Sequence, residues 1–232
     1  THTHTQPQYT MSTTQLPRFS YFPLTARGLS LLLALEEHKV RYTPHVVTFD
    51  EWPAVKASGI SPFGQLPLLE TQDAGAVTQS QAILRYVGGK ADALGKDVAE
   101  KARHDMVVGI ADDLFSDLVK AQPTVVAKDK APAEVRKLWK ETIPGRLALV
   151  EKFLGNKDRF TKAGNTVGEL HLFAMLYQLK EETKQDTVLD ATPNLLAFYK
   201  RVRALPAVQT VLKGKSAFGP GGAVPFFLPH DA

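Results

Sequence analysis

The run FGQLPLLETQDAGAVTQSQAILRY, residues 63–86, constrains the fold of this chain more than any other segment. The apolar residues after Pro67 predict a strand, the turn residues 73–75 predict a hairpin, and the Ala-Ile-Leu run after Ser80 predicts a helix. Pro67 has no amide hydrogen, so at the start of a strand it suits a sheet edge or a cis turn and leaves the backbone of Leu66 free to pair outward. The segment therefore predicts a strand hairpin that leads directly into a helix.

The start of that helix favours the binding of an anion. Ser80 stands just before the apolar run, where its hydroxyl and the first free amides of the helix can receive a carboxylate. A proline before a strand and a serine before a helix are each common for structural reasons alone. At this spacing the two are much less often accidental, and together they indicate a site for a small anionic peptide.

Length and composition bound the class of protein. A chain of 232 residues, 44% of them apolar, can bury a sizeable core, and we interpret it as two unequal domains. It has no run of eighteen apolar residues, and its first seventeen positions lack the charged start and apolar centre of a signal peptide. We therefore expect a soluble, cytoplasmic protein without a membrane partner.

The chain contains no cysteine, which excludes disulfides, thiolate metal sites and a cysteine nucleophile. Any thiol chemistry must come from the substrate. The formal net charge of +4 is mild, and the basic residues are scattered among acids, so we expect no nucleic-acid partner. Residues 1–16 are polar and aperiodic and predict a disordered tail. His2 and His4 in this tail have no further ligand nearby, so no metal is expected.

Residues 17–90 alternate between strand and helix signals. A leucine-rich helix between the first two predicted strands supplies the crossover that a parallel pair requires. The order strand, helix, strand, helix, hairpin, helix is thioredoxin-like. The predicted elements are strands at 18–22 and 42–48, a helix from Leu29 to about His38, a short helical piece at 52–59, a hairpin formed by 66–70 and 76–78, and a helix at 80–87.

Residues 91–232 show no convincing strand before Ser216 and predict an all-helical second domain with an irregular C-terminal tail. Pro144 should kink or divide one of its helices. Thr166 and Glu169 form a capping-box pattern, with Thr166 as N-cap and Glu169 reaching back. Two apolar stripes have helical spacing: Met106, Val107, Ile110, Ala111, Leu114 and Leu118 form the first, and Val135, Leu138, Trp139, Thr142 and Ile143 form the second.

Two motifs carry a resemblance to a known family. The FGQLP and QSQAILRY segments resemble the glutathione-binding half of cytosolic glutathione transferases, closest to the sigma and pi classes, and FSYFPL at 19–24 resembles the Tyr-Phe strand end of those classes. The likeness covers residues 21–65 without a gap and continues weakly to about Lys213. It implies a thioredoxin-like α/β domain at 17–90, an all-α domain at 91–232, glutathione as co-substrate, a homodimer, and small electrophilic substrates.

The resemblance also implies roles for individual residues. Tyr21 matches the catalytic tyrosine, which contacts glutathione and stabilises its thiolate. Asp113 resembles an acid that reaches the amino group of the ligand from the other subunit. Phe22 and Leu24 are expected to line the hydrophobic acceptor site. Contacts with glutathione are further implied for Arg27, Trp52, Lys56, Gln65, Leu66, Pro67, Gln79 and Ser80.

Some alternatives stay open at this stage. Ser20 and Thr25 are rival hydroxyls to Tyr21, and a register shifted by two residues would make Arg27 a structural arginine and put Leu29 in its contact position. We expect conjugation of the glutathione thiolate to apolar electrophiles. The alternatives are a glutathione-dependent isomerase of the prostaglandin-synthase type and a non-catalytic ligand-binding or crystallin-like protein.

Overall fold

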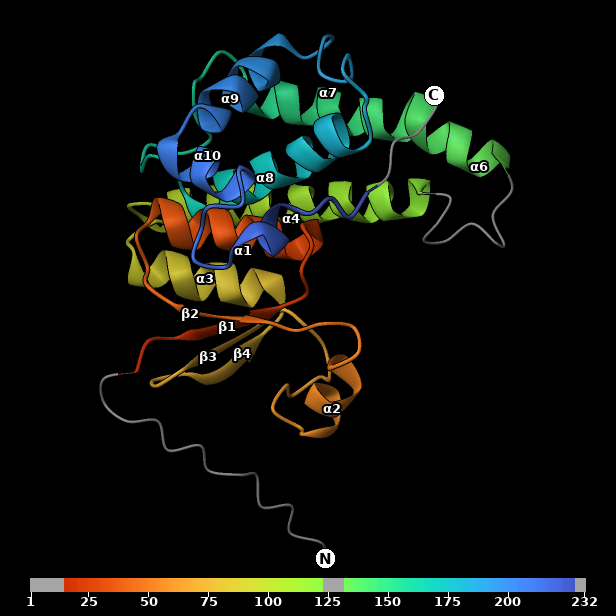
Figure 1. The fold of residues 1–232 in the computed structure, drawn as a ribbon. Coiled ribbons are helices and arrows are strands. Elements are labelled where there is room, and N and C mark those ends of the chain that lie inside the picture. Colours follow the sequence, from red (N-terminus) through yellow and green to blue (C-terminus); the bar gives the residue numbers. More distant parts are fainter. Residues whose placement is uncertain (1–14, 123–131, 228–232) are drawn as a thin grey trace, which may run out of the picture.

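The computed structural model describes residues 15–122 and 132–227, so all but the last two residues of the predicted disordered tail lie outside the described residues. The N-terminal part is a four-stranded sheet with helices α1 and α3 on one face (Figure 1). Its elements are β1 (Arg18–Tyr21), α1 (Ala26–Glu37), β2 (Thr43–Val46), α2 (Trp52–Ala57), β3 (Leu68–Thr71), β4 (Gly75–Thr78) and α3 (Ser80–Lys90).

The sheet has the strand order β2-β1-β3-β4. β1 pairs in parallel with β2, with Tyr21 opposite Val46, and antiparallel with β3, with Ser20 opposite Leu68. The parallel pair is joined by α1, which lies between the sheet and the helical part and buries leucines on nearly every face. This two-sided burial explains why the helix is apolar almost throughout instead of amphipathic.

The remaining described chain is helical and packs around α8 (Figure 1). Every residue of α8 from Val167 to Leu176 is buried, because the helix contacts α1, α4 and α9. The predicted thioredoxin-like domain followed by an all-helical domain is therefore confirmed, while the exact domain boundaries stay predictions. The elements are α4 (Val98–Ala121), α6 (Pro132–Lys137), the π-helical turn η1 (Leu138–Thr142), α7 (Ile143–Leu154), α8 (Val167–Tyr177), the π-helical turn η2 (Gln178–Glu182), α9 (Pro193–Arg203), α10 (Pro206–Leu212) and the 3₁₀ turn η3 (Pro220–Ala223).

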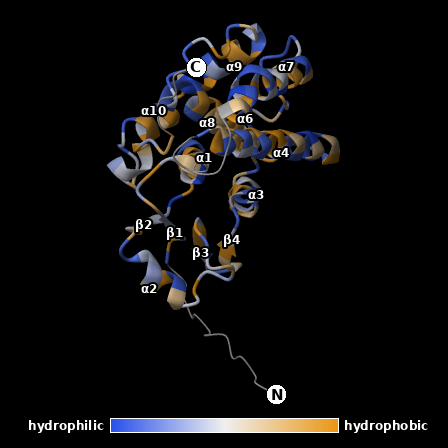
Figure 2. Ribbon diagram, turned by 90° about the vertical axis from the view of Figure 1, so that its right-hand side faces the viewer, coloured by the Kyte–Doolittle hydropathy of each residue, from blue (hydrophilic) through white to orange (hydrophobic). Residues whose placement is uncertain are grey.

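One residue of the first predicted apolar stripe was placed wrongly. Hydrophobic and hydrophilic residues alternate along α4 (Figure 2), and its buried face contains Val107, Ala111, Leu114 and Leu118. Met106 precedes that face by one residue, which turns its side chain about 100° around the helix, and it is 56% exposed. Pro144 was predicted to kink or divide a helix. The backbone stays helical through Thr142 and Ile143, and the regular α-helix is interrupted just before Pro144 by the π-helical turn η1.

The predicted capping box at the start of α8 forms only in part. Thr166 is the N-cap, and its Oγ1 accepts a hydrogen bond from the Glu169 amide at 3.3 Å. Glu169 does not reach back, because its Oε1 accepts from the Phe160 amide at 2.7 Å and the Thr166 amide donates to Gly164. The carboxylate therefore joins α8 to the loop before it instead of closing the cap.

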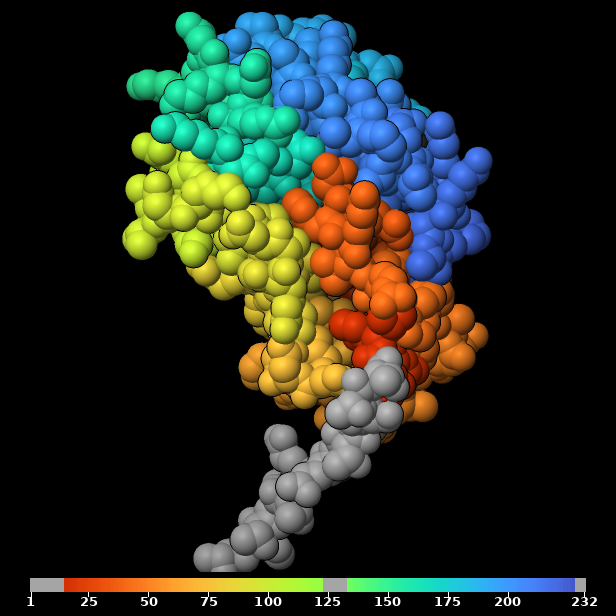
Figure 3. Space-filling view, turned by 90° about the vertical axis from the view of Figure 1, so that its left-hand side faces the viewer, coloured from red at the N-terminus to blue at the C-terminus, as the bar shows by residue number. Residues whose placement is uncertain are grey.

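The C-terminal segment, residues 219–227, crosses the start of α1. The Thr25 amide donates to the Val224 carbonyl at 2.8 Å, and the Phe226 amide donates to Thr25 Oγ1 at 3.0 Å and to Glu182 Oε2 at 3.1 Å. Phe227 is fully buried. Figure 3 shows the blue C-terminal residues against the orange residues of the N-terminal part, so the C-terminal segment lies beside α1.

Candidate active site

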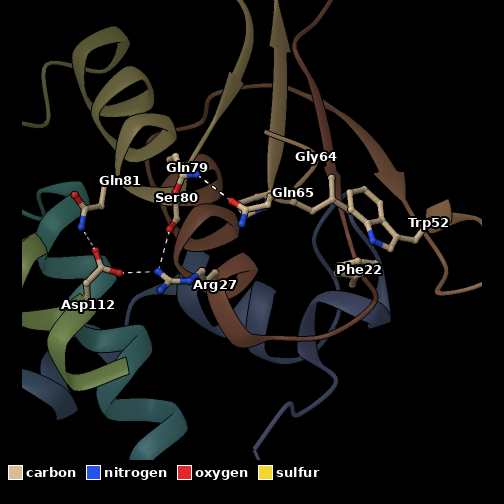
Figure 4. Close-up of a pocket in the computed structure, with 11 residues that line it drawn as sticks. Phe22, Arg27, Trp52, Gly64, Gln65, Gln79, Ser80, Gln81 and Asp112 are labelled. Carbon is tan, nitrogen blue, oxygen red and sulfur yellow. Dashed lines mark hydrogen bonds and ion pairs between the residues drawn. The ribbon is translucent and has the colours of Figure 1, made fainter. Parts of the chain in front are cut away.

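A cavity of about 750 Å³ opens beside the N-terminus of α1 (Figure 4). Its volume falls within the range of small-molecule sites. Its walls come from the β1–α1 connection, α2, the loop before β3, the start of α3 and the middle of α4. The lining residues are Phe22, Arg27, Trp52, Gly64, Gln65, Leu66, Pro67, Gln79, Ser80, Gln81 and Asp112.

One end of the cavity is built on the start of α3. Ser80 is its first residue, and the first amides of a helix have no carbonyl partner within that helix. Gln79 before it has φ of 69°, a conformation uncommon for a residue other than glycine, and its Nε2 donates to Gln65 Oε1 at 3.1 Å. This unusual backbone turns the chain sharply from β4 into α3 and leaves free amides and a hydroxyl at the cavity wall, a suitable arrangement for a carboxylate.

Arg27 joins three helices at this polar end. Its Nη1 donates to Asp112 Oδ1 of α4 at 2.7 Å and to Ser80 Oγ of α3 at 3.3 Å. Its guanidinium also lies over the Phe115 ring, 4.4 Å from the ring centre. Figure 4 shows Arg27 directed toward both Ser80 and Asp112. The positive charge is thus fixed next to the expected carboxylate position.

Asp112 supplies a negative charge at the same end. Burial opposes ionisation of this carboxyl, but the contacts with His171, Gln81 and Arg27 outweigh it and lower the pKa of Asp112 to about 2. Gln81 Nε2 donates to its Oδ2. Because the carboxylate is ionised at neutral pH and lies on the cavity wall, it can attract an ammonium group of a ligand.

The other end of the cavity is aromatic. Phe22 stacks on Phe49 with ring centres 5.0 Å apart and meets Trp52 edge-on at 5.6 Å. Between the two ends runs the backbone of Leu66, which precedes a cis peptide bond to Pro67, one of the two geometries that the sequence favoured. The loop before it is closed by Ser61, whose hydroxyl donates to the Gln65 carbonyl at 2.6 Å.

Tyr21 lies behind this cavity and is not among its lining residues. Its side chain is nearly buried at 5% exposure, and its ring packs directly on Gly28, where an added Cβ would stand 2.3 Å from Tyr21 Cδ1. Burial raises the pKa of Tyr21 to about 12, and the amides of Arg27 and Gly28 offset this only in part. The phenol is therefore protonated at neutral pH and can act as a hydrogen-bond donor.

The rival hydroxyls are already engaged. Ser20 Oγ lies 2.9 Å from His45 Nδ1 of β2, and Thr25 Oγ1 accepts from the Phe226 amide. Both residues are buried. Their hydrogen bonds serve the sheet and the C-terminal segment. The Tyr21 oxygen, in contrast, accepts from the amides of Arg27 and Gly28 and keeps its own proton to donate.

The structure brings most of the predicted site residues together. Lys56 is exposed and does not line the cavity, although its Cε lies beside Gly64, which does. Asp113 is 61% exposed at its side chain and pairs with Arg146 at 3.0 Å, and Leu24 packs on the core. The predicted residues that do line the cavity are Phe22, Arg27, Trp52, Gln65, Leu66, Pro67, Gln79 and Ser80.

Sequence reasoning missed three lining residues. Gln81 belongs to the same QSQ run as Ser80, and Asp112 is the neighbour of Asp113, so both lay in motifs already singled out. Gly64 belongs to the FGQLP run.

Within the described residues there is no cluster of three or more His, Cys, Asp or Glu side chains suited to a metal ion. No helix in the described part of the chain is long and apolar enough to span a bilayer.

Comparison with known proteins agrees with this arrangement. Residues 29–89 match the glutathione S-transferase N-terminal domain and residues 112–215 match its C-terminal domain. Glutathione S-transferase 3 of Gallus gallus is 32% identical over 170 residues, which cover 71% of each chain. Hematopoietic prostaglandin D synthase of Mus musculus is 27% identical over 188 residues, 81% of this chain and 90% of the relative.

Solved structures show the same fold. The glutathione S-transferase of Ascaris lumbricoides superposes with a TM-score of 0.74 at 24% identity, over 86% of this chain and 97% of that one. A thioredoxin-like sheet joined to a helical domain is the architecture that these proteins share. The chain belongs to the glutathione S-transferase family.

Proposed function

We propose that this protein is a glutathione transferase that adds the glutathione thiolate to small, largely apolar electrophiles. The observation that carries the proposal is the cavity itself, which has a charged and hydrogen-bonding end at Arg27, Ser80 and Asp112 and an aromatic end at Phe22 and Trp52. Such a cavity suits a zwitterionic peptide that presents its thiol to an apolar partner.

The polar groups are spaced to bind glutathione along the cavity. The γ-glutamyl carboxylate would receive hydrogen bonds from Ser80 and the first amides of α3, and its ammonium would face Asp112. The cysteinyl backbone would pair with Leu66 as an added short strand. The glycine carboxylate would meet Trp52 at the cavity wall and Lys56, which does not line the cavity. The ends of the peptide are thereby distinguished by charge.

Tyr21 is the proposed activator of the thiol. A phenol with a pKa of about 12 keeps its proton and donates a hydrogen bond to the anionic form of the sulfur, which favours the thiolate. The thiolate then attacks the electrophilic carbon, and the leaving group departs with the bond electrons. Phe22 and Leu24 are proposed to contact the acceptor, with Phe22 at the cavity wall and Leu24 deeper against the core.

The proposed assembly is a cytoplasmic homodimer. Asp113 is turned away from the cavity of its own chain and is 61% exposed, which supports its proposed contact with glutathione in the other subunit. Its ion pair with Arg146 is at the surface and contributes less than about 1 kcal/mol, so it is no obstacle to such a contact.

A second candidate function uses the same thiolate transiently. Four of the relatives carry the name hematopoietic prostaglandin D synthase, which favours a glutathione-dependent isomerase of the prostaglandin-synthase type. Both functions require bound glutathione and an activated thiol. They differ in whether glutathione is consumed.

The test measures binding first and turnover second. Calorimetry with glutathione should show saturable binding, and Ser80→Ala should weaken it about tenfold, which corresponds to about 1.4 kcal/mol. Ser58→Ala is the matched control, because its hydroxyl bonds Val55 at the end of α2 outside the cavity. A chloronitrobenzene should be turned over only with glutathione. Isomerisation of a prostaglandin endoperoxide without loss of glutathione would favour the second candidate, and absence of glutathione binding would refute both.

A further inference from the structure

A histidine outside the cavity is connected to its polar end. His171 on α8 is fully buried and does not line the cavity. It lies between two helices, with Nδ1 2.7 Å from Ser30 Oγ of α1 and Nε2 3.5 Å from Asp112 Oδ1 of α4. The same Oδ1 receives the Arg27 Nη1 hydrogen bond at 2.7 Å. Three helices thus meet through one buried imidazole.

The hydrogen bond to Ser30 indicates which imidazole nitrogen carries the proton. The Ala26 carbonyl, one turn earlier, already accepts from Gln178 Nε2, so Nδ1 of His171 is the available acceptor for the Ser30 hydroxyl. With Nδ1 accepting, the ring proton resides on Nε2. Nε2 has no hydrogen bond within the described chain and faces the Asp112 carboxylate. Ser30 therefore sets the tautomer that presents a positive hydrogen to Asp112.

Asp112 has His171 as one of three partners. Its Oδ2 receives Gln81, and its Oδ1 is shared by Arg27 on the cavity side and His171 on the buried side. Arg27 is held by this carboxylate on one side and by the Phe115 ring on the other. His171 is thus the contact of Asp112 on the buried side, whereas Gln81 and Arg27, which line the cavity, hold the carboxylate from the other side.

We propose that His171 is a positioning residue for glutathione binding, which holds Asp112, and through Asp112 the Arg27 guanidinium, at the polar end of the cavity. This inference rests on the proposed function, because the ligand that benefits is glutathione. His171 does not touch the ligand. It fixes the charges that do, and Ser30 fixes His171.

The test replaces His171 by phenylalanine and measures glutathione affinity by calorimetry, together with KM for glutathione and kcat. The expected result is at least fivefold weaker binding and a matching rise in KM, with kcat at saturating glutathione within about twofold of wild type. His171→Gln, which can still donate to Asp112, should recover part of the affinity. Ser30→Ala should weaken binding in the same direction without removing a large side chain.

His104→Phe is the matched control. His104 is also buried, bridges α4 and α8 by accepting from the Gly168 amide at 3.0 Å, and does not line the cavity. The His104→Phe variant should lower the melting temperature about as much as His171→Phe does, while its Kd for glutathione stays within twofold of wild type.

Three outcomes would overturn the inference. One is wild-type glutathione affinity in His171→Phe. A second is an equal loss of affinity in the His104 and His171 variants, which would mean general destabilisation. Should His171→Phe fail to fold, unchanged affinity in both His171→Gln and Ser30→Ala would have the same force. A wild-type protein that does not bind glutathione would instead refute the proposed function itself.

Discussion

The hydroxyl of Tyr21 should act on thiol ionisation rather than on peptide binding, and Tyr21→Phe separates the two. The phenol is held against Gly28 by packing, so removal of one oxygen leaves the ring in place. Because Ser80, Asp112 and Leu66 line the cavity and Tyr21 does not, glutathione affinity should stay within a few-fold of wild type.

The size of the effect follows from the hydrogen bond that is lost. A hydrogen bond to a charged acceptor contributes about 1.5 to 3 kcal/mol, equivalent to about 1 to 2 pKa units of the bound thiol. Without it the thiol returns toward about 8.5, so the thiolate fraction at pH 6.5 falls about 10- to 50-fold. A more basic thiolate is also more nucleophilic, which restores about three- to eightfold if a Brønsted slope near 0.45 applies. The net rate loss at pH 6.5 is therefore about three- to sixfold.

The assay is the pH profile of chloronitrobenzene conjugation at saturating glutathione. Tyr21→Phe should raise the apparent pKa of the profile by about 1 to 2 units and match or exceed wild-type rates at pH 9. Tyr42→Phe is the control, since Tyr42 is likewise buried but bonds Glu36 at 3.3 Å and does not line the cavity. An unshifted profile in Tyr21→Phe would refute the reasoning, and Ser20 or Thr25 would be tested next.

Three further predictions concern the surroundings of the site. Burial raises the pKa of Glu182 to about 7. Relative to the unfolded chain, this carboxyl therefore contributes stability below about pH 4.5, and that stability is lost as the pH rises through 7. The melting temperature of Glu182→Gln should rise relative to that of wild type between about pH 5 and 8, and a constant difference would contradict this. Gly28→Ala should lower stability by about 1 to 3 kcal/mol and displace the Tyr21 ring, visible as a changed pH profile, whereas Gly109→Ala, whose Cβ meets nothing within 4 Å, should do neither. Asp113→Ala should weaken glutathione binding more than about fivefold without dissociating the dimer in light scattering, because an ion pair desolvated between subunits contributes several times the 1 kcal/mol of an exposed one; a monomeric wild type would contradict it.

The order of elements could be predicted from sequence because each strand and helix has a strong local signal. The leucines of α1, the Pro67 turn and the Ser80 helix start are local features, and the structure keeps them where the pattern put them. The wrong assignment arose where two adjacent residues of one helix are both suited to be buried. Met106 and Val107 are both apolar, and only the packing of α4 against α8 decides which is buried.

The two adjacent acids of α4 show the same limit at the site. Asp112 and Asp113 differ by about 100° around the helix, and the sequence alone does not reveal which one faces α1. Arg27 and His171, distant in sequence, select Asp112. Likewise, the Tyr21 ring can occupy its position only because Gly28 has no side chain. This close approach is a contact across a turn, and no sequence pattern indicates it.

The meeting of the C-terminal segment with the start of α1 has a consequence for biosynthesis. A ribosome adds Phe226 about 150 residues after the last strand of the thioredoxin-like sheet, so at about 5 to 20 residues per second the interval lasts about 7 to 30 seconds. During that time the carbonyl and amide partners of Thr25 and Glu182 do not yet exist. The loop beside Tyr21 thus reaches its final hydrogen bonding only after residue 226 has been added, and a nascent chain or a product shortened before this segment would carry the cavity without this support.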